Sequence, residues 1–269
     1  MKKVREVRRI DIKAGEPSAK PIRLSFSDPE TYVEIRIGKG ATATIFDTSS
    51  SKTHSVGITL EPQSSLLYVS VSSSSAKKFQ STVASGASIH WHCTTIGGRN
   101  DAHELISRLT GPDAKSTVDW IFFAKGKERQ SVSVRNIFAA PEGRGEVTIK
   151  GVAQDHSKSS CYGMIEITEQ GRGTNTYLTE DVLMLDPTAQ IDAVPALEIR
   201  TNDVKASHSA TISRVTSEDL FYLQSRGLQV DMAKQMFVDG FLLAIVERIP
   251  DASIREAVCS ALRLKSAPE

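Results

Sequence analysis

The stretch Ala196-Leu-Glu-Ile-Arg-Thr-Asn-Asp-Val-Lys-Ala-Ser-His-Ser-Ala-Thr-Ile212 is soon followed by Ser217-Glu-Asp-Leu-Phe-Tyr-Leu-Gln-Ser-Arg-Gly-Leu228. The first part is typical of β-strands and contains one histidine, His208. The second part predicts an amphipathic helix, which Thr216 or Ser217 can cap and which Gly227 can end in a left-handed conformation. The sequence therefore predicts a change from strand to helix near residue 213.

Upstream of this junction, the sequence from about residue 20 to residue 213 predicts short strands separated by turns. The strands are about four to eight residues long, rich in β-branched residues and alternating in polarity. Examples are Tyr32–Ile37, Ser64–Val71, Glu146–Val152 and Gly163–Thr168. The short stretch Ala102–Leu109 is a weak candidate for a helix within this β-rich region.

A small or turn residue also precedes a strand at irregular intervals of roughly 25 to 45 residues. This recurrence fits the stacked coils of a β-helix or another solenoid, in which each coil buries its apolar face on its neighbours. A β-sandwich fits the number of strands almost as well, so periodicity alone leaves both folds open. The recurrences are Gly38–Ile45, Ser85–Trp91, Gly111–Val118, Gly143–Ile149 and Asp186–Ile191.

Two further helices are predicted after Gly227. One covers about Val230–Arg248, because apolar residues recur there at three- and four-residue spacing. Pro250 ends it, and Ala252–Leu264 forms a shorter helix. The predicted apolar stripe of the longer helix is Ala233, Met236, Phe237, Gly240, Phe241, Ala244 and Ile245.

The bulk composition favours a protein with a sizeable core and no broad charged surface. Of 269 residues, 39% are hydrophobic, and 33 basic residues nearly balance 32 acidic ones. This balance argues against an extensive surface for nucleic acid or anionic membranes. No apolar stretch approaches the roughly 20 residues that span a bilayer, and the basic N-terminus lacks the apolar core of a signal peptide. We therefore expect a cytoplasmic protein.

The cysteines give no sign of a disulfide framework or of a structural zinc site. Cys93, Cys161 and Cys259 are far apart and odd in number, and no Cys-x-x-Cys spacing is present. With so few and so widely spaced cysteines, a complete metal-cluster site supplied by this chain alone is equally unexpected.

The junction around His208 resembles the core of the SufB/SufD family, the scaffold subunits of the SUF iron–sulfur cluster assembly machine. The resemblance implies a mainly β fold, namely a right-handed parallel β-helix core over residues 1–215, the first 20 or so being a short lead-in. It also implies a C-terminal helical subdomain over residues 216–269 that docks an ABC-type ATPase similar to SufC. The long N-terminal helical region of many family members has no counterpart in this sequence, which looks like a minimal form.

The same resemblance makes His208 the candidate residue at a metal or cluster interface. The family pattern has a histidine in a Ser-His-Gly-Ala-Thr-like strand, and this chain has Lys205-Ala-Ser-His-Ser-Ala-Thr211. The scaffold-type branch carries a cysteine where Ala189 stands, just before Val194-Pro-Ala-Leu-Glu198, and a glutamate where Ser209 stands. These departures place the chain closer to the SufD-like branch, with Ser209 and Glu198 as neighbouring candidates beside His208.

For the ATPase, the resemblance points to Phe221, Tyr222, Arg226 and Gly227 as the beginning of the docking element. No Gly-x-x-x-x-Gly-Lys-Ser/Thr motif is present, so any nucleotide hydrolysis would come from a partner. In the run His90-Trp-His-Cys93, strand geometry puts the histidines on one face and Trp91 in the core. Cys161 is most simply a buried apolar residue.

These observations predict a non-enzymatic subunit of an iron–sulfur assembly complex. It would pair with a second SufB/SufD-type chain or with itself, and would bind an ABC-type ATPase. A transient iron–sulfur cluster or iron ion would be its cargo, with no tightly bound cofactor. A homodimeric scaffold that itself holds a nascent cluster is one alternative. A β-helix enzyme acting on carbohydrate is another, from a different class.

Overall fold

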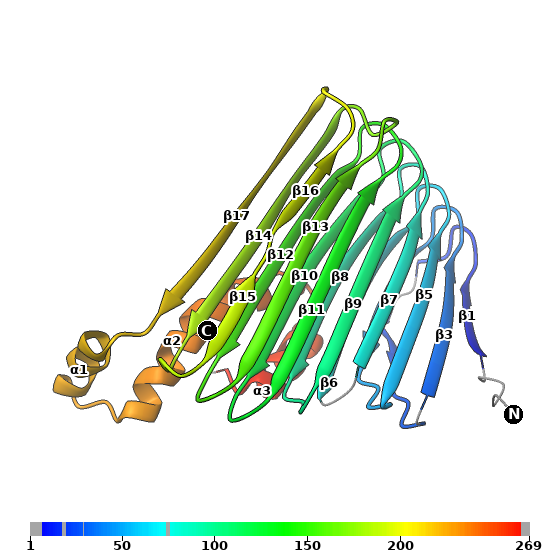
Figure 1. Cartoon of the computed structure of the whole chain (residues 1–269). Coiled ribbons are helices and arrows are strands. Elements are labelled where there is room, and N and C mark those ends of the chain that lie inside the picture. The colour runs from blue at the N-terminus through cyan, green and yellow to red at the C-terminus, as the bar shows by residue number, and fades with distance from the viewer. Residues whose placement is uncertain (1–6, 18–19, 29, 74–75, 265–269) are drawn as a thin grey trace, which may run out of the picture.

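The chain winds as a parallel β-helix with helices against one side (Figure 1). The computed structural model describes residues 7–17, 20–28, 30–73 and 76–264. Within them, successive strands alternate between a nine-stranded sheet A and an eight-stranded sheet B, except that β15 and β16 both belong to sheet A, and every strand pair is parallel. Sheet A comprises β1 (Val7–Ile12), β3 (Glu30–Ile37), β5 (Thr53–Leu60), β7 (Ala76–Val83), β9 (Asp101–Leu109), β11 (Arg129–Phe138), β13 (Lys158–Ile167), β15 (Gln190–Ala193) and β16 (Ala196–Ile199). Sheet B comprises β2 (Ile22–Leu24), β4 (Thr42–Asp47), β6 (Ser65–Ser73), β8 (Ser88–Ile96), β10 (Lys115–Ala124), β12 (Arg144–Ala153), β14 (Thr174–Met184) and β17 (Val204–Arg214).

The parallel β-helix expected from the family resemblance is confirmed, and a β-sandwich is excluded. The alternation of each strand explains the fold, because one set of side chains points into the space between the sheets and the other points outward. In the interior, aromatic rings from neighbouring coils contact one another: Tyr68 and Trp91 have ring centroids 5.0 Å apart, and Phe79 and Trp120 6.1 Å apart. The predicted core position of Trp91 is confirmed.

One corner of the β-helix is a ladder of stacked turns, each leading from a sheet A strand to a sheet B strand. The backbone N–H of Gly40 donates to the carbonyl of Pro62, that of Gln63 to Ser85, and that of Gly86 to Pro112. Each donor residue has a positive φ, between 61° and 67°, which is the left-handed conformation that glycine adopts at no steric cost. Several predicted strand entries fall on this corner.

The strands lengthen from one end of the molecule to the other. In sheet B, β2 has 3 residues, β4 has 6, β8 has 9 and β17 has 11. The β-helix is therefore tapered, and its broad end is the one formed by β14 and β17 (Figure 1).

The weak helix prediction for Ala102–Leu109 is wrong, because this segment is strand β9. It pairs in parallel with β7 and β11, and His103, Leu105 and Leu109 are buried in phase. Every second side chain of this segment is buried between the neighbouring coils. The stabilisation from this burial exceeds any local preference of the sequence for a helix.

The C-terminal helices are α1 (Ser217–Ser225), α2 (Val230–Val246) and α3 (Ala252–Leu262). Thr216 caps α1 through a reciprocal hydrogen-bond pair with Asp219, and Gly227 follows the helix with a φ of 90°. α2 and α3 cover the outer face of sheet B, where their apolar residues pack on strand residues such as Val69 and Ile121.

The buried side of α2 differs in part from the predicted stripe. Met236 and Ala244 are exposed, whereas Val238 and Leu242 are buried together with the predicted Ala233 and Ile245. α2 is apolar on more than one side, so spacing alone does not determine which side meets the sheet.

Candidate functional site

The broad end of the β-helix terminates in strand β17, which carries His208. β17 pairs with β14 along its length, and within the described residues it has no strand on its other side. His208 lies opposite Leu178, whose side chain is in the core. His208 therefore faces the inner side of the sheet, but at an uncovered end, where it is exposed.

The other two predicted residues of this site project elsewhere. Ser209 lies opposite Thr179, so it faces the outer side of sheet B. Glu198 lies opposite Glu166 on the outer side of sheet A, where it forms an ion pair with Arg200. His208, Ser209 and Glu198 thus belong to three different surfaces, and the structure does not bring them together.

A thiol and a carboxyl group lie together one coil below the exposed end. Cys161 on β13 and Glu180 on β14 both point inward and are buried. Glu180 Oε1 accepts a hydrogen bond of 2.5 Å from the backbone N–H of Gly163. Burial raises the pKa of Glu180 to about 7, although this hydrogen bond acts in the opposite direction. Burial also raises the pKa of the Cys161 thiol, and the charge of nearby Glu180 raises it further.

The predicted docking residues lie on α1, which projects from the body of the protein (Figure 1). Within the described residues α1 has no buried side chain. Phe221 is 72% exposed and Tyr222 is 57% exposed, and the guanidinium of Arg226 lies 5.3 Å from the centre of the Tyr222 ring. α1 therefore presents aromatic and cationic groups to solvent.

The first half of α2 also exposes apolar side chains, a feature that the sequence prediction missed. Met232 and Met236 are 48% and 56% exposed, and Val230 at the helix start is also exposed. We call Phe221, Tyr222, Val230, Met232 and Met236 the helical apolar patch. Exposed apolar clusters of this kind mark interaction surfaces.

The histidines of β8 link sheet B to the segment after α2. His90 Nε2 lies 2.8 Å from the buried carboxylate of Asp119, which also accepts a 2.8 Å hydrogen bond from Arg248. His92 is buried, and its Nε2 lies 3.1 Å from the carbonyl oxygen of Ile245. Burial lowers the pKa of His92 to about 4, so this imidazole is neutral at physiological pH. These contacts give the pair a role in holding α2 on the sheet.

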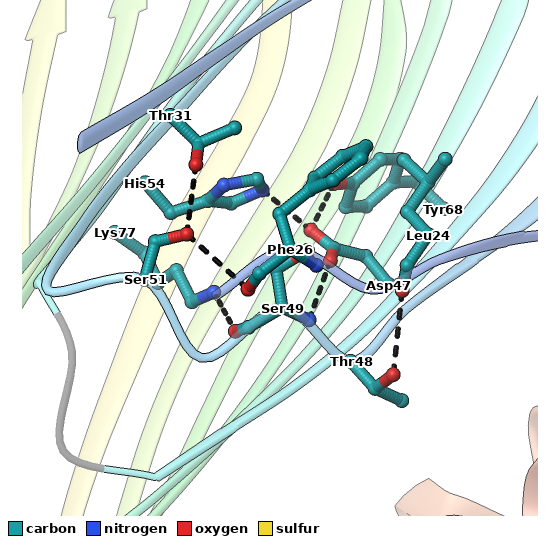
Figure 2. A network of polar contacts seen from close by, with 10 residues as sticks. All are labelled: Leu24, Phe26, Thr31, Asp47, Thr48, Ser49, Ser51, His54, Tyr68 and Lys77. Atoms are coloured by element: carbon teal, nitrogen blue, oxygen red, sulfur yellow. Dashed lines mark hydrogen bonds and ion pairs between the residues drawn. The ribbon is translucent and has the colours of Figure 1, made fainter. Parts of the chain in front are cut away.

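A second buried polar cluster lies near the narrow end (Figure 2). Asp47 accepts a 2.6 Å hydrogen bond from the Tyr68 hydroxyl and lies 2.7 Å from His54 Nε2. Lys77 donates a 2.7 Å hydrogen bond to the carbonyl of Ser49. Burial tends to raise the pKa of Asp47, but the hydrogen bond with His54 and the charges of His54 and Lys77 lower it overall. This cluster fixes the turn after β4 against β6 and β7.

Within the described part of the chain, no three His, Cys, Asp or Glu side chains are already grouped so that they could hold a metal ion. A cluster bound by this chain alone would therefore need further ligands. The geometry offers instead an open strand edge, a histidine facing that edge and a projecting helical surface.

A known protein family matches most of the chain. Residues 29–241 match the family described as SUF system FeS cluster assembly, SufBD core domain. The chain belongs to the SufBD core family. The matched range includes β17, α1 and most of α2, so the SufBD core comprises both the open strand edge and the helical apolar patch.

Related bacterial proteins are also named as iron–sulfur cluster assembly SufBD family proteins. One from Mycobacterium tuberculosis is 27% identical over 233 residues, which cover 84% of this chain and 28% of the relative. One from Mycobacterium leprae is 28% identical over 232 residues, with 84% and 26% covered. One from Staphylococcus epidermidis is 25% identical over 224 residues, with 81% and 47% covered. This SufBD core thus spans between about a quarter and a half of the length of the relatives that it matches.

The described helices of this SufBD core include none that is long and apolar enough to cross a membrane. Sequence reasoning placed His208 on a strand and anticipated the three helices, but it missed Glu180, Asp119 and Lys77. For Glu180 and Lys77 the signal was the strand phase, because Glu180 shares the inward phase of Leu178 and Val182, and Lys77 shares that of Phe79. Asp119 lies in the outward phase of β10 and gave no such signal. A charged residue in the apolar phase of a strand marks a buried polar site.

Proposed function

We propose that this SufBD core is a non-enzymatic subunit of a SUF-type iron–sulfur cluster assembly complex, closer to SufD than to SufB. Family membership supports the assembly role. The SufD-like character rests on Ala189 and Ser209, which stand where the scaffold branch has a cysteine and a glutamate. The cargo would be a transient cluster or iron ion held near His208.

The exposed edge of β17 would pair with a second SufB/SufD-type chain or with another copy of this one. Its eleven residues have unpaired backbone groups on one side, and such an edge is a template for strand addition. Ile212 is 46% exposed on the same strand, which adds apolar area to the contact. His208 would then lie at the interface between the chains.

The helical apolar patch would bind an ABC-type ATPase similar to SufC, and this exposed patch is the observation that carries the proposal. Phe221 and Tyr222 make few contacts within the chain, and aromatic side chains with a neighbouring arginine are the residues that dominate protein interfaces. ATP-driven movement of the bound ATPases would reach the β17 interface through the short connection from Val215 to Thr216.

The test is co-expression with the ABC-type ATPase of the same genome, followed by size exclusion with light scattering. We expect a complex with two copies of each protein, and its loss in the double variant Phe221→Ala/Arg226→Glu. Gln224→Ala changes another exposed position of α1 and serves as the matched control, which should still form the complex. If folded wild-type protein forms no complex, the docking role is wrong.

A further inference from the structure

The thiol and carboxyl groups beneath the broad end form a buried pair without a counter-ion. No salt bridge of Glu180 is present within the described residues, and its Oε2 is buried without a hydrogen-bond partner. A carboxyl group that is buried in this way is costly to ionise, and a bound cation would remove that penalty. Cys161 lies on the same strand as Gly163, whose N–H donates to Glu180, and precedes it by two residues.

The backbone makes room for this pair at Gly163. Gly163 follows Cys161 by two residues on the same inward face of β13. A Cβ atom at Gly163 would lie 2.8 Å from Glu180 Oε1 and 2.5 Å from a methyl carbon of Leu178. The missing side chain therefore lets the Glu180 carboxyl group reach across from sheet B towards the strand that carries Cys161.

The last coil covers the pair with small side chains. In the register, Cys161 lies beside Ala193 on β15, and Glu180 lies beside Ala210 on β17. Sheet A is also interrupted directly after Ala193, because β15 ends there and β16 begins at Ala196. Two alanines and this interruption are what lies between the pair and the exposed end.

We propose that Cys161 and Glu180 are the protein ligands of one divalent transition-metal ion of the Fe²⁺, Co²⁺ or Zn²⁺ class, with water at the remaining positions. Thiolate and carboxylate together suit these borderline metals better than Mg²⁺ or Ca²⁺. On binding, the metal–sulfur bond replaces the S–H bond, and the thiol proton passes to the buffer together with any proton on Glu180. No electron is transferred. This site does not depend on the proposed function, since the purified chain would bind the metal without ATPase or second subunit.

The test uses Co²⁺ as the probe, because a thiolate ligand gives Co²⁺ an intense near-ultraviolet charge-transfer band. Purified chain, first treated with chelator and then freed of it, is titrated with Co²⁺ while absorbance and proton release are recorded. We expect one Co²⁺ per chain, a thiolate band and release of protons. Cys161→Ser should abolish the band, and Glu180→Gln should weaken Co²⁺ binding by at least about tenfold.

The matched control is Cys93→Ser, which removes another buried, inward-facing thiol from sheet B. Its band and affinity should equal those of the wild type. The proposal is overturned if wild-type protein gives no thiolate band, or if Cys161→Ser retains it. If circular dichroism shows that Cys161→Ser does not fold, the proposal is tested with Glu180→Gln instead. An unchanged Co²⁺ affinity in that variant rejects the site.

Discussion

At the scale of single residues, most inward side chains of the β-helix are apolar, but polar side chains and a few charged ones also occupy the inward phase of a strand. Hydrogen bonds offset the cost of burying Asp47 and Lys77. The Asp47 carboxylate accepts a hydrogen bond from Tyr68, and the Lys77 ammonium group donates one to the carbonyl of Ser49. Glu180 has no cationic partner among the residues that the structure describes, and burial raises its pKa to about 7. Its protonation state therefore changes within the physiological range.

Glu180→Gln should make stability less sensitive to pH. The folded-state pKa of about 7 exceeds the usual 4.5, so the stabilising protonated form is fully present below pH 4.5 and is lost as pH rises through 7. Glutamine imitates the protonated form at every pH. The free energy of unfolding of the variant should therefore rise relative to wild type by about 3 kcal/mol between pH 4.5 and pH 8.

This difference is measured by urea unfolding at several pH values with chelator present, so that no metal contributes. Other titrating groups contribute equally to both proteins and cancel in the comparison. A difference that stays constant with pH would show that Glu180 ionises normally in the folded protein.

At the scale of elements, strands were easier to predict than the faces that helices bury. The alternation of apolar and polar residues in β3, β6 and β12 could be recognised in the sequence, because each strand has one side facing the core and one facing outward. The sequence of Ala102–Leu109 was ambiguous because its polarity pattern is short. The segment forms a strand because it pairs with parallel strands on neighbouring coils. The packing side of α2 was predicted only in part, since it depends on the outer face of sheet B, which is distant in sequence.

Asp119 should couple that outer face to the helices. Its carboxylate joins His90 on the sheet to Arg248 after α2, and it is fully buried. Asp119→Asn should lower the free energy of unfolding by about 2 kcal/mol, because charge-assisted hydrogen bonds are lost. A double-mutant cycle with Arg248→Gln by urea denaturation should give a clear coupling energy, whereas a coupling near zero would make the contact incidental.

At the scale of the whole molecule, the parallel coils could be anticipated only in part. The stacked turns at Gly40, Gly86 and Asp113 produce the recurrence seen in the sequence, but the turn at Gln63 has no glycine and was missed. Recurrence alone could not separate a β-helix from a β-sandwich, because strand pairing is non-local. The role of His208 stays a prediction, and its predicted neighbours are not grouped with it, since Ser209 faces the opposite side of the strand and Glu198 belongs to the other sheet.

Stability should vary along the β-helix. Each coil contacts its neighbours, so central strands such as β10 have partners on both sides, whereas β17 has one and α1 lies apart. In hydrogen–deuterium exchange, amides of β10 should exchange most slowly and those of α1 and the outer edge of β17 most rapidly. Equal protection of α1 and β10 in the isolated chain would contradict this gradient.

The taper of the β-helix bears on how copies of the chain can assemble. A head-to-tail contact would place the eleven residues of β17 against the three residues of β2, leaving most of the longer strand without hydrogen bonds. Two broad ends, in contrast, match in length. The unequal ends thus disfavour open filaments, the usual hazard of an exposed parallel strand, and favour closed two-fold assemblies.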